Sequence, residues 1–340
     1  MKQHYFKLSV LIALACIPCV IFSQDIHYTN FGFSPLNINP ALTGSFKGDM
    51  RFMGNYRSQW NSVPVSYLTF SGGADMKLGN SLLDTRHWRV GLLFNYDQAG
   101  DSHLNNSSLY GTIAYALPVS ATGSLSVGGS LGYNQRAFKT ADLYFDDQYK
   151  DLVFSANNHT QEVILDKTIN YMDISGGVNY HHQAITSRTS FDAGVGLFHL
   201  NTPNKSFAGD PAVNCEVRKS AYVNSAIAVS KNVDLLVDAM AQFQGPHTEY
   251  LIGVGGRLFI ANKALQQIAL QGGLTLRNGD AIVPHLGLIY DQWRVAVNYD
   301  FNFSQFKTAS VWNGGPEINV HYIISRVPAA KYCPLCPVYL

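Results

Sequence analysis

Charged residues are scarce in this chain of 340 residues. Lys and Arg number 24 and Asp and Glu number 23, so 14% of the residues are charged and the formal net charge is +1. An average soluble protein carries about 25% charged residues. A balance this close to neutral gives no reason to expect a nucleic-acid partner, which requires a basic surface. The mean hydropathy is only −0.02, so uncharged polar residues rather than apolar ones replace the missing charges.

Long apolar runs are also missing after the N-terminus. No such stretch approaches the ~18 residues that a membrane-spanning helix needs. A disordered chain is disfavoured as well, because such chains are poor in aromatic residues and this one has 19 Tyr and 19 Phe beside 29 Gly. The remaining class is a β-rich protein, and the composition suits one whose outer face meets lipid.

Residues 1–23 have the features of a secretory signal peptide. Lys2 and Lys7 supply positive charge, an apolar stretch follows, and the small residue Ser23 is a plausible cleavage point. A lipoprotein signal at Cys16 is the alternative, although cleavage there would leave an awkward apolar terminus. We therefore expect an exported protein.

Cysteine is scarce in the mature chain. Two of the five cysteines lie in the signal peptide, which leaves Cys215, Cys333 and Cys336. An odd number in an exported chain means that at least one is unpaired or pairs with another molecule.

Apolar and polar residues alternate along most of the chain from about residue 49 onward. In the stretch 293–302, for example, Trp293 and Val297 alternate with Arg294 and Asn298. This period of two residues predicts β-strands, although a soluble β-sandwich shows the same alternation. Two features favour a membrane barrel: the polar face carries Ser, Asn and Gly rather than Lys and Glu, and aromatic residues mark strand ends. These aromatic residues are Trp60, Trp88, Tyr133 and Tyr180.

The pattern predicts an all-β fold, a transmembrane antiparallel outer-membrane β-barrel of about 14 strands within residues 49–325. Their centres are expected near residues 54, 70, 92, 112, 130, 176, 195, 225, 238, 254, 271, 285, 297 and 320.

The connections between these strands are expected to alternate in length. Those after the fourth, sixth, eighth, tenth and twelfth strands are short, and those after the third, fifth, seventh and thirteenth are long. The connection after the second strand, 79–87, is the one that does not fit this alternation. Outer-membrane barrels have short periplasmic turns and long external loops. An even strand number returns the chain to its starting side, so we expect both termini in the periplasm. The C-terminal tail is residues 326–340.

Several groups of residues resemble a known family. The first is Pro35-Leu36-x-x-Asn39-Pro40-Ala41-x-x-Gly44, and the second is Tyr56-Arg57-x-Gln59-Trp60. Further groups are Trp88-Arg89-Val90-Gly91, a Gly-rich strand that leads to His199 and Pro203, and Tyr299-Asp300-Phe301-Asn302. This sequence resembles the PorP/SprF family of Bacteroidetes outer-membrane proteins, and the matches follow in order through nearly the whole mature chain.

The resemblance implies a role in the type IX secretion and gliding machinery. The implied partners are secreted cargo proteins with type B C-terminal sorting domains, the periplasmic and outer-membrane components of the machinery, and outer-membrane lipid. Residues 24–48 form a segment rich in proline and aromatic residues, and proline restricts its backbone. We expect this segment to be periplasmic or to lie inside the barrel.

The sequence contains no recognisable catalytic, metal-binding or cofactor-binding pattern. Gly253-Val254-Gly255-Gly256 lies inside an alternating strand, where a phosphate loop would need a turn into a helix. His181 and His182 point to opposite faces of a strand, which is poor metal geometry. Cys333-x-x-Cys336 could form a local disulfide, bond to a partner or provide half of a metal site, and we favour the local disulfide.

The leading hypothesis for function is therefore a non-enzymatic barrel that helps to secrete cargo or anchor it at the cell surface. A diffusion channel is the alternative, because barrels of similar size can enclose water. An enzyme acting on lipid or peptide is a third, and no nucleophile–base pair supports it. We expect the tail, with Cys333 and Cys336, to bind a periplasmic partner.

Overall fold

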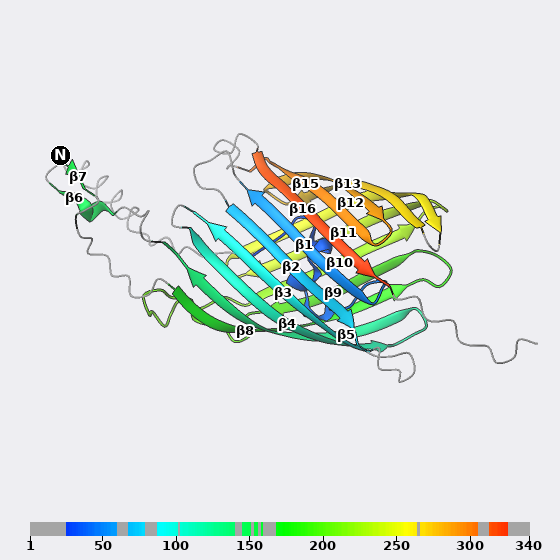
Figure 1. Cartoon of the computed structure of the whole chain (residues 1–340), viewed down its shortest axis with the longest axis horizontal. Coiled ribbons are helices and arrows are strands. Elements are labelled where there is room, and N and C mark those ends of the chain that lie inside the picture. The colour runs from blue at the N-terminus through cyan, green and yellow to red at the C-terminus, as the bar shows by residue number, and fades with distance from the viewer. Residues whose placement is uncertain are drawn as a thin grey trace, which may run out of the picture.

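The computed structural model describes residues 25–59, 67–78, 87–100, 103–139, 145–150, 153–155, 158, 168–263, 266–304 and 313–325. Its main feature is a closed barrel of fourteen strands (Figure 1). Each strand pairs antiparallel with the next along the chain, β5 pairs with β8, and β16 closes the barrel against β1. The strands are β1 (Met50–Gln59), β2 (Tyr67–Lys77), β3 (Trp88–Ala99), β4 (Leu104–Pro118), β5 (Gly123–Ala137), β8 (Thr168–Gln183), β9 (Ser190–Phe198), β10 (Arg218–Ala228), β11 (Val233–Gln244), β12 (His247–Lys263), β13 (Gln266–Arg277), β14 (Ala281–Tyr290), β15 (Trp293–Asn302) and β16 (Asn313–Ile324).

The predicted fold class is confirmed, and every predicted strand centre lies within an observed barrel strand. Two further short strands, β6 (Tyr149–Lys150) and β7 (Val153–Phe154), pair with each other in the connection between β5 and β8. They form a separate small sheet outside the barrel wall (Figure 1).

The alternation of side chains puts apolar residues on the outside of the wall. Leu92 is 60% exposed and Val127 is 56% exposed. Their neighbours along the strands point inward and are buried: Ser126 is 0% exposed and Leu93 is 4% exposed. An apolar surface of this extent around a closed barrel is stable against lipid hydrocarbon, where the closed sheet leaves no backbone edge unpaired.

We call the end of the barrel where β1 begins and β16 ends the near end, and the opposite end the far end. Aromatic residues cluster on the outer wall at the near end. The rings of Trp88 and Tyr115 meet edge to face at 4.9 Å between centroids, and those of Trp293 and Tyr322 lie 4.7 Å apart. This arrangement corresponds to the aromatic belt of membrane barrels.

The predicted short turns are confirmed at the near end, where they span 119–122, 184–189, 229–232, 264–265 and 291–292. The predicted long loop after the third strand is wrong. β3 and β4 are joined by residues 100–103 at the far end, where the His103 amide donates to the Gly100 carbonyl. Gly100 and His103 both have positive φ, 77° and 47°, so a tight turn suffices. The other predicted long connections, 138–167, 199–217 and 303–312, start and end at far-end strand termini. Within them, residues 140–144, 151–152, 156–157, 159–167 and 305–312 lie outside the described residues.

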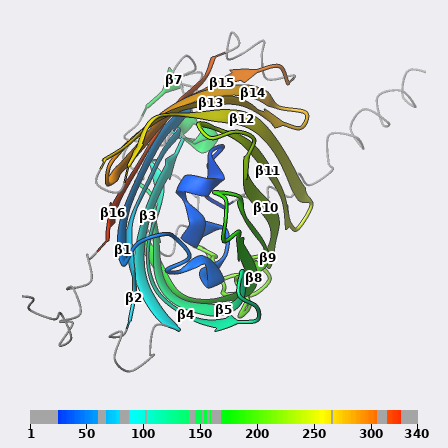
Figure 2. The same cartoon turned by 90° about the vertical axis from the view of Figure 1, so that its right-hand side faces the viewer.

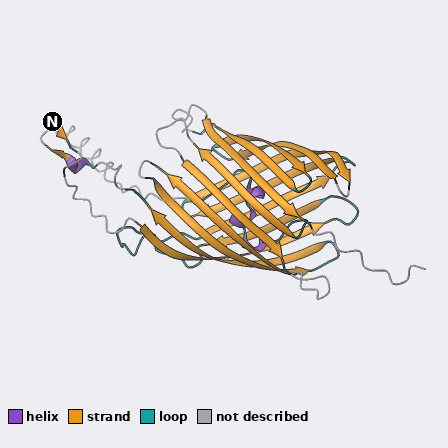
Figure 3. Ribbon diagram, viewed as in Figure 1, coloured by secondary structure: helices purple, strands orange, loops and turns teal. Residues whose placement is uncertain are grey.

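Among the described residues, helical structure is confined to short 3-10 turns. Three of them, η1 (Phe31–Phe33), η2 (Pro35–Asn37) and η3 (Pro40–Leu42), lie inside the barrel (Figure 3). A fourth, η4 (Asp146–Gln148), precedes β6. In the described ranges no helix has both the length and the apolar character needed to cross a membrane.

Candidate functional site

Residues 25–46, which we call the lumenal segment, occupy the inside of the barrel (Figure 2). Proline favours the compact path of this segment, because Pro35 and Pro40 each open a 3-10 turn where their missing amide hydrogens are not needed. Asn39 caps the third turn, since its Oδ1 accepts a hydrogen bond of 2.9 Å from the Ala41 amide. The family-like motif is thus a set of turns rather than a strand.

The lumenal segment runs along the barrel from the far end to the near end. The Asp25 amide donates to the side chain of Gln244, the last residue of β11 at the far end. The Asp49 amide donates to the carbonyl of Ile324, the last residue of β16 at the near end.

The path of the lumenal segment separates the first and last described parts of the chain, which the even strand number had been expected to bring to the same side of the membrane. β1 begins and β16 ends at the same end, as an even strand number requires. The first described residue, Asp25, nevertheless lies at the opposite end from the last strand residue, Ile324. The reason is that the chain crosses the lumen before β1 starts. The termini themselves, before residue 25 and after residue 325, lie outside the described residues.

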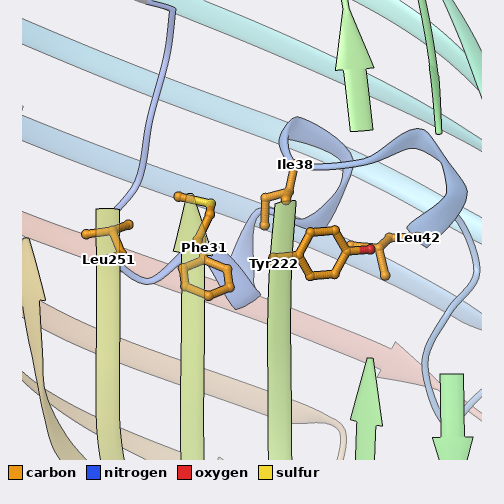
Figure 4. Packing of buried hydrophobic residues seen from close by; sticks show 6 residues of the cluster. Phe31, Ile38, Leu42, Tyr222 and Leu251 are labelled. Atoms are coloured by element: carbon orange, nitrogen blue, oxygen red, sulfur yellow. The ribbon is translucent and has the colours of Figure 1, made fainter. Parts of the chain in front are cut away.

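Apolar side chains hold the middle of the lumenal segment to one wall of the barrel. Phe31, Ile38 and Leu42 pack against side chains from β10, β11 and β12 (Figure 4). The wall partners are Tyr222, Met240 and Leu251. On the opposite side, Leu36 packs against Met53 of β1 and Leu93 of β3. The segment therefore joins opposite walls of the barrel.

Amide side chains supply the polar contacts of the same region. The Asn39 side chain donates to the Val178 carbonyl at 2.8 Å and to the Tyr222 hydroxyl at 3.1 Å. Asn37 and Asn95 exchange hydrogen bonds through both of their amide groups, at 3.1 Å and 2.9 Å. Because these groups are buried, an unmatched partner would be costly.

Glycines in the wall make room for the lumenal segment. A Cβ atom added to Gly128 of β5 would lie 2.6 Å from the Ala41 nitrogen, a distance that real Cβ atoms do not show. Gly196 of β9 similarly faces the Ile38 carbonyl oxygen. At these two positions the segment and the wall leave no space for even a methyl group.

Charged side chains bind the segment near the far end. We call Arg57, Arg277, Asp300 and Glu317 the far-end cluster. Asp300 pairs with Arg57 at 2.6 Å and with Arg277 at 3.0 Å, and all three side chains are at most 5% exposed. The lumenal segment completes the cluster, because the Thr29 amide donates to Glu317 at 2.9 Å and Arg57 donates to the His27 carbonyl at 2.7 Å.

A smaller group of charges holds the near end. Asp75 accepts from the Gly44 amide at 2.7 Å and pairs with Arg51 at 2.7 Å. Gly44 has a φ of 65°, which an L side chain rarely adopts, and a Cβ there would press on Arg89. Lys77 donates to the Phe46 carbonyl at 2.6 Å. The segment is therefore fixed by charge at both ends.

A third charged group lies at the opening of the barrel at its far end, which we call the far mouth. His199, which directly follows β9, places Nε2 2.5 Å from Asp25 and Nδ1 3.0 Å from Asp173. Arg218 lies 3.4 Å from the same Asp25 oxygen. Burial alone would lower the pKa of His199, but the two carboxylates outweigh it and raise the pKa to about 12. Burial raises the pKa of Asp25, but His199 and Arg218 outweigh it and hold this pKa well below its usual range.

The burial of inward-facing polar residues shows that the lumen is filled. Asn179 and Asn319 are 0% exposed, and Asn134 is 1% exposed. A water-filled channel of the porin type would leave such side chains hydrated. The cavity between the segment and the wall near Asp25 has a volume of about 40 Å³, room for only a few water molecules.

The structure brings together most of the residues that the sequence singled out, in three places. The lumenal segment carries Pro35, Leu36, Asn39, Pro40, Ala41 and Gly44, and Arg57 meets it at the far-end cluster. His199 and Pro203 lie at the far mouth, where the Pro203 carbonyl accepts from the Cys215 amide at 2.8 Å. Tyr56 points outward and is 42% exposed, and Gln59 ends β1. Trp60, Cys333 and Cys336 lie outside the described residues.

Sequence reasoning missed the charged partners of the lumenal segment. Asp75, Asp300 and Glu317 occupy inward-facing positions of their strands, and the sequence pattern did not predict that they bind the segment. One feature of the sequence could have revealed them. A carboxylate on the inward face of a barrel strand needs a hydrogen-bonding or positively charged partner, and the chain has only 24 Lys and Arg residues. The sequence could not show which arginine meets which carboxylate, because 243 residues separate Arg57 from Asp300.

The family assignment follows from comparison with known proteins. Residues 20–322 match the family described as type IX secretion system membrane protein PorP/SprF. The chain belongs to the PorP/SprF family. The family match therefore spans the lumenal segment, the wall, the far-end cluster and the far mouth, and makes this PorP/SprF protein a membrane component of the type IX secretion system. None of the curated proteins matches the chain.

Solved structures of outer-membrane barrels are similar to this PorP/SprF protein in fold. CdiB from Escherichia coli has 10% identity and a TM-score of 0.44, and the match covers 82% of this chain and 63% of CdiB. The CymD monoaromatic hydrocarbon channel has 10% identity and a TM-score of 0.46, with coverage of 87% and 94%. A Pseudomonas aeruginosa FadL homologue has 10% identity and a TM-score of 0.46, with coverage of 84% and 92%. This PorP/SprF protein thus spans less than two thirds of the length of CdiB.

Proposed function

We propose that this PorP/SprF protein is a non-enzymatic adaptor of the type IX secretion system, which helps to secrete cargo with type B C-terminal sorting domains or to hold it at the cell surface. The filled lumen carries this proposal. A barrel whose inner wall binds its own N-terminal segment by apolar contacts, amide pairs and three charged groups offers external surfaces to partners rather than a path to solutes. The diffusion channel is the competing function.

The proposed orientation puts the near end in the periplasm and the far end at the cell surface. Five of the six connections at the near end are short, the exception being 78–87, and the two longest connections, 138–167 and 199–217, belong to the far end. This distribution supports the orientation. In this orientation the tail 326–340 with Cys333 and Cys336 starts in the periplasm, whereas Asp25 lies at the surface mouth. The far-end connections are then the surfaces that cargo reaches.

Deletion of the gene tests the proposal against the channel. We expect loss of release or surface retention of one cargo protein or a small set, measured by surface proteomics, with normal uptake of small solutes. Purified protein in liposomes should admit sugars no faster than empty liposomes. Unchanged surface proteins together with sugar influx would establish the channel and overturn the adaptor.

A disulfide lock tests whether the lumenal segment must move. The hydroxyls of Thr43 and Thr112 lie 2.9 Å apart, one on the segment and one on β4, so Thr43→Cys with Thr112→Cys should cross-link the two. An adaptor with a permanently filled lumen keeps its secretion activity when locked. Loss of secretion in the oxidised double variant, with activity retained after reduction and in Thr43→Cys alone, would show that the segment leaves the barrel and would contradict the adaptor.

The tail is proposed to bind a periplasmic partner of the secretion apparatus. Truncation after Arg326 should leave barrel insertion intact and abolish cargo secretion or co-purification of the partner. Replacing Cys333 and Cys336 with Ser separates the contribution of the thiols from that of the peptide. Normal insertion, secretion and co-purification of the truncated protein would show that the tail has no such role.

A further inference from the structure

The far mouth gathers three side chains of the types that bind transition metals. Asp25 starts the lumenal segment, His199 follows β9, and Cys215 precedes β10, and their ligand atoms all lie within 4.8 Å of one another. His199 is 5% exposed and Cys215 is 4% exposed. Imidazole, thiolate and carboxylate are the ligands of tetrahedral Zn²⁺. We propose that Asp25, His199 and Cys215 form a Zn²⁺ site, with a water molecule as the fourth ligand.

The surroundings of His199 support this assignment. Asp173 is 0% exposed, and its Oδ1 lies 3.0 Å from Nδ1 of His199, on the far side of the ring from Asp25. Neither that oxygen nor Nδ1 has a well-aligned hydrogen-bond partner. A zinc-bound histidine commonly donates its other ring nitrogen to a carboxylate, which fixes the ring and strengthens the ligand. Asp173 is placed for that role.

The neighbouring contacts leave room for the ion and for water. Tetrahedral ligands at about 2.0–2.3 Å from zinc lie roughly 3.3–3.7 Å from one another. Asp25 therefore needs to retreat from His199 by about 1 Å, and it can, because it begins the segment and its side chain is 26% exposed. The adjoining cavity of about 40 Å³ is lined by Asp25 and His199 and supplies space for the water.

The charges around the site suit a divalent cation. Zinc binds cysteine as the thiolate and histidine as the neutral imidazole. With the Cys215 thiolate and the carboxylates of Asp25 and Asp173, three negative charges would face the three positive charges of Zn²⁺ and the Arg218 guanidinium. The buried group with zinc bound is therefore neutral, which avoids the cost of an unmatched buried charge.

The proposed site would attach the start of the mature chain to the barrel mouth. His199 and Cys215 flank the connection 199–217, and Asp25 comes from the lumenal segment. One ion would thus join that connection to the segment. The zinc site would also give a role to Cys215, which forms no disulfide.

The test uses the full mature protein with Cys333→Ser and Cys336→Ser, so that Cys215 is its only thiol. After chelator treatment and dialysis against Zn²⁺, elemental analysis should find one zinc per chain. With Co²⁺ in its place, a thiolate-to-cobalt charge-transfer band should appear. Because no other thiol is present, the band assigns Cys215 without any further variant. Absence of both retained zinc and the band would overturn the proposal.

Variants then identify the remaining ligands. Cys215→Ser should abolish the band, and His199→Gln should abolish stoichiometric zinc. Asp173→Asn keeps the hydrogen bond to Tyr110 possible but weakens the support of the ring, so zinc affinity should fall roughly 10–100-fold. His103→Gln, a change at an exposed histidine near the same mouth, is the matched control and should change nothing. Unchanged zinc binding in both Cys215→Ser and His199→Gln would show that the metal lies elsewhere.

Discussion

The first residues of the lumenal segment and its middle are held by different interactions. Residues 25–30 reach the wall through charges and hydrogen bonds, chiefly those of His199 and the far-end cluster. Residues 31–42 make no charged pairs with the wall among the described residues: they pack with apolar side chains on two walls and with Ala41 against Gly128, and add the amide hydrogen bonds of Asn37 and Asn39. Charge pairs in a buried site are costly when broken, whereas shape tolerates small changes at a smaller cost. The comparison suggests that charges fix where the segment starts and that packing fixes its path.

Breaking the charged part should have the largest effect. Arg57→Leu removes the partner of Asp300 and Glu317 and the donor to the His27 carbonyl. Leaving buried carboxylates without it should lower the free energy of unfolding by about 3–5 kcal/mol, measured by urea titration in lipid vesicles. Tyr56→Leu, one residue away on the outer face, is the control. Equal losses in the two variants would contradict the distinct role of the cluster.

Crowding the middle should have an intermediate effect. Gly128→Ala puts a methyl group against the Ala41 backbone, so the segment or the strand must shift, at a cost of about 1–3 kcal/mol. Gly129→Ala is the matched control, since its Cβ would meet only the Ser175 carbonyl at an ordinary 3.5 Å. The measurement is the same urea titration, with protease sensitivity of residues 25–46 as a second readout. A larger loss of unfolding free energy in Gly129→Ala than in Gly128→Ala would show that the lumenal segment does not lie against Gly128.

Removing the Tyr222 hydroxyl should have the smallest effect on stability. This change separates the hydrogen bonds from the apolar packing that hold the middle of the lumenal segment. Tyr222→Phe keeps the ring that packs with Ile38 but loses the hydrogen bonds to Asn39 and Asn179. We expect a loss of roughly 1 kcal/mol in the same unfolding measurement. Tyr133→Phe, on the exposed outer face, should be neutral. A loss above that of Gly128→Ala would show that hydrogen bonds rather than packing determine the path.

The wall could be predicted from the sequence because each strand carries its own signal. Val127 and Ser126 reveal by type alone which side faces lipid, and turns such as 119–122 are local. The lumenal segment could be recognised as irregular from Pro35 and Pro40. Its partners could not be predicted, because contacts such as Asn39 with Tyr222 join residues 183 positions apart. The contact between Asp25 and His199 at the far mouth could not be predicted for the same reason, because the two residues become neighbours only when the chain crosses the lumen.

The seam between the first and last strands is linked to the lumenal segment. β1 and β16 pair from Met50 with Ile324 to Arg57 with Glu317, so the last pair of the seam consists of two members of the far-end cluster. Both also bind the lumenal segment, through the His27 carbonyl and the Thr29 amide. Seam closure and seating of the segment therefore share the same two side chains. A barrel closed without its segment in place would leave Arg57 and Glu317, the last pair of the seam, without the His27 carbonyl and the Thr29 amide.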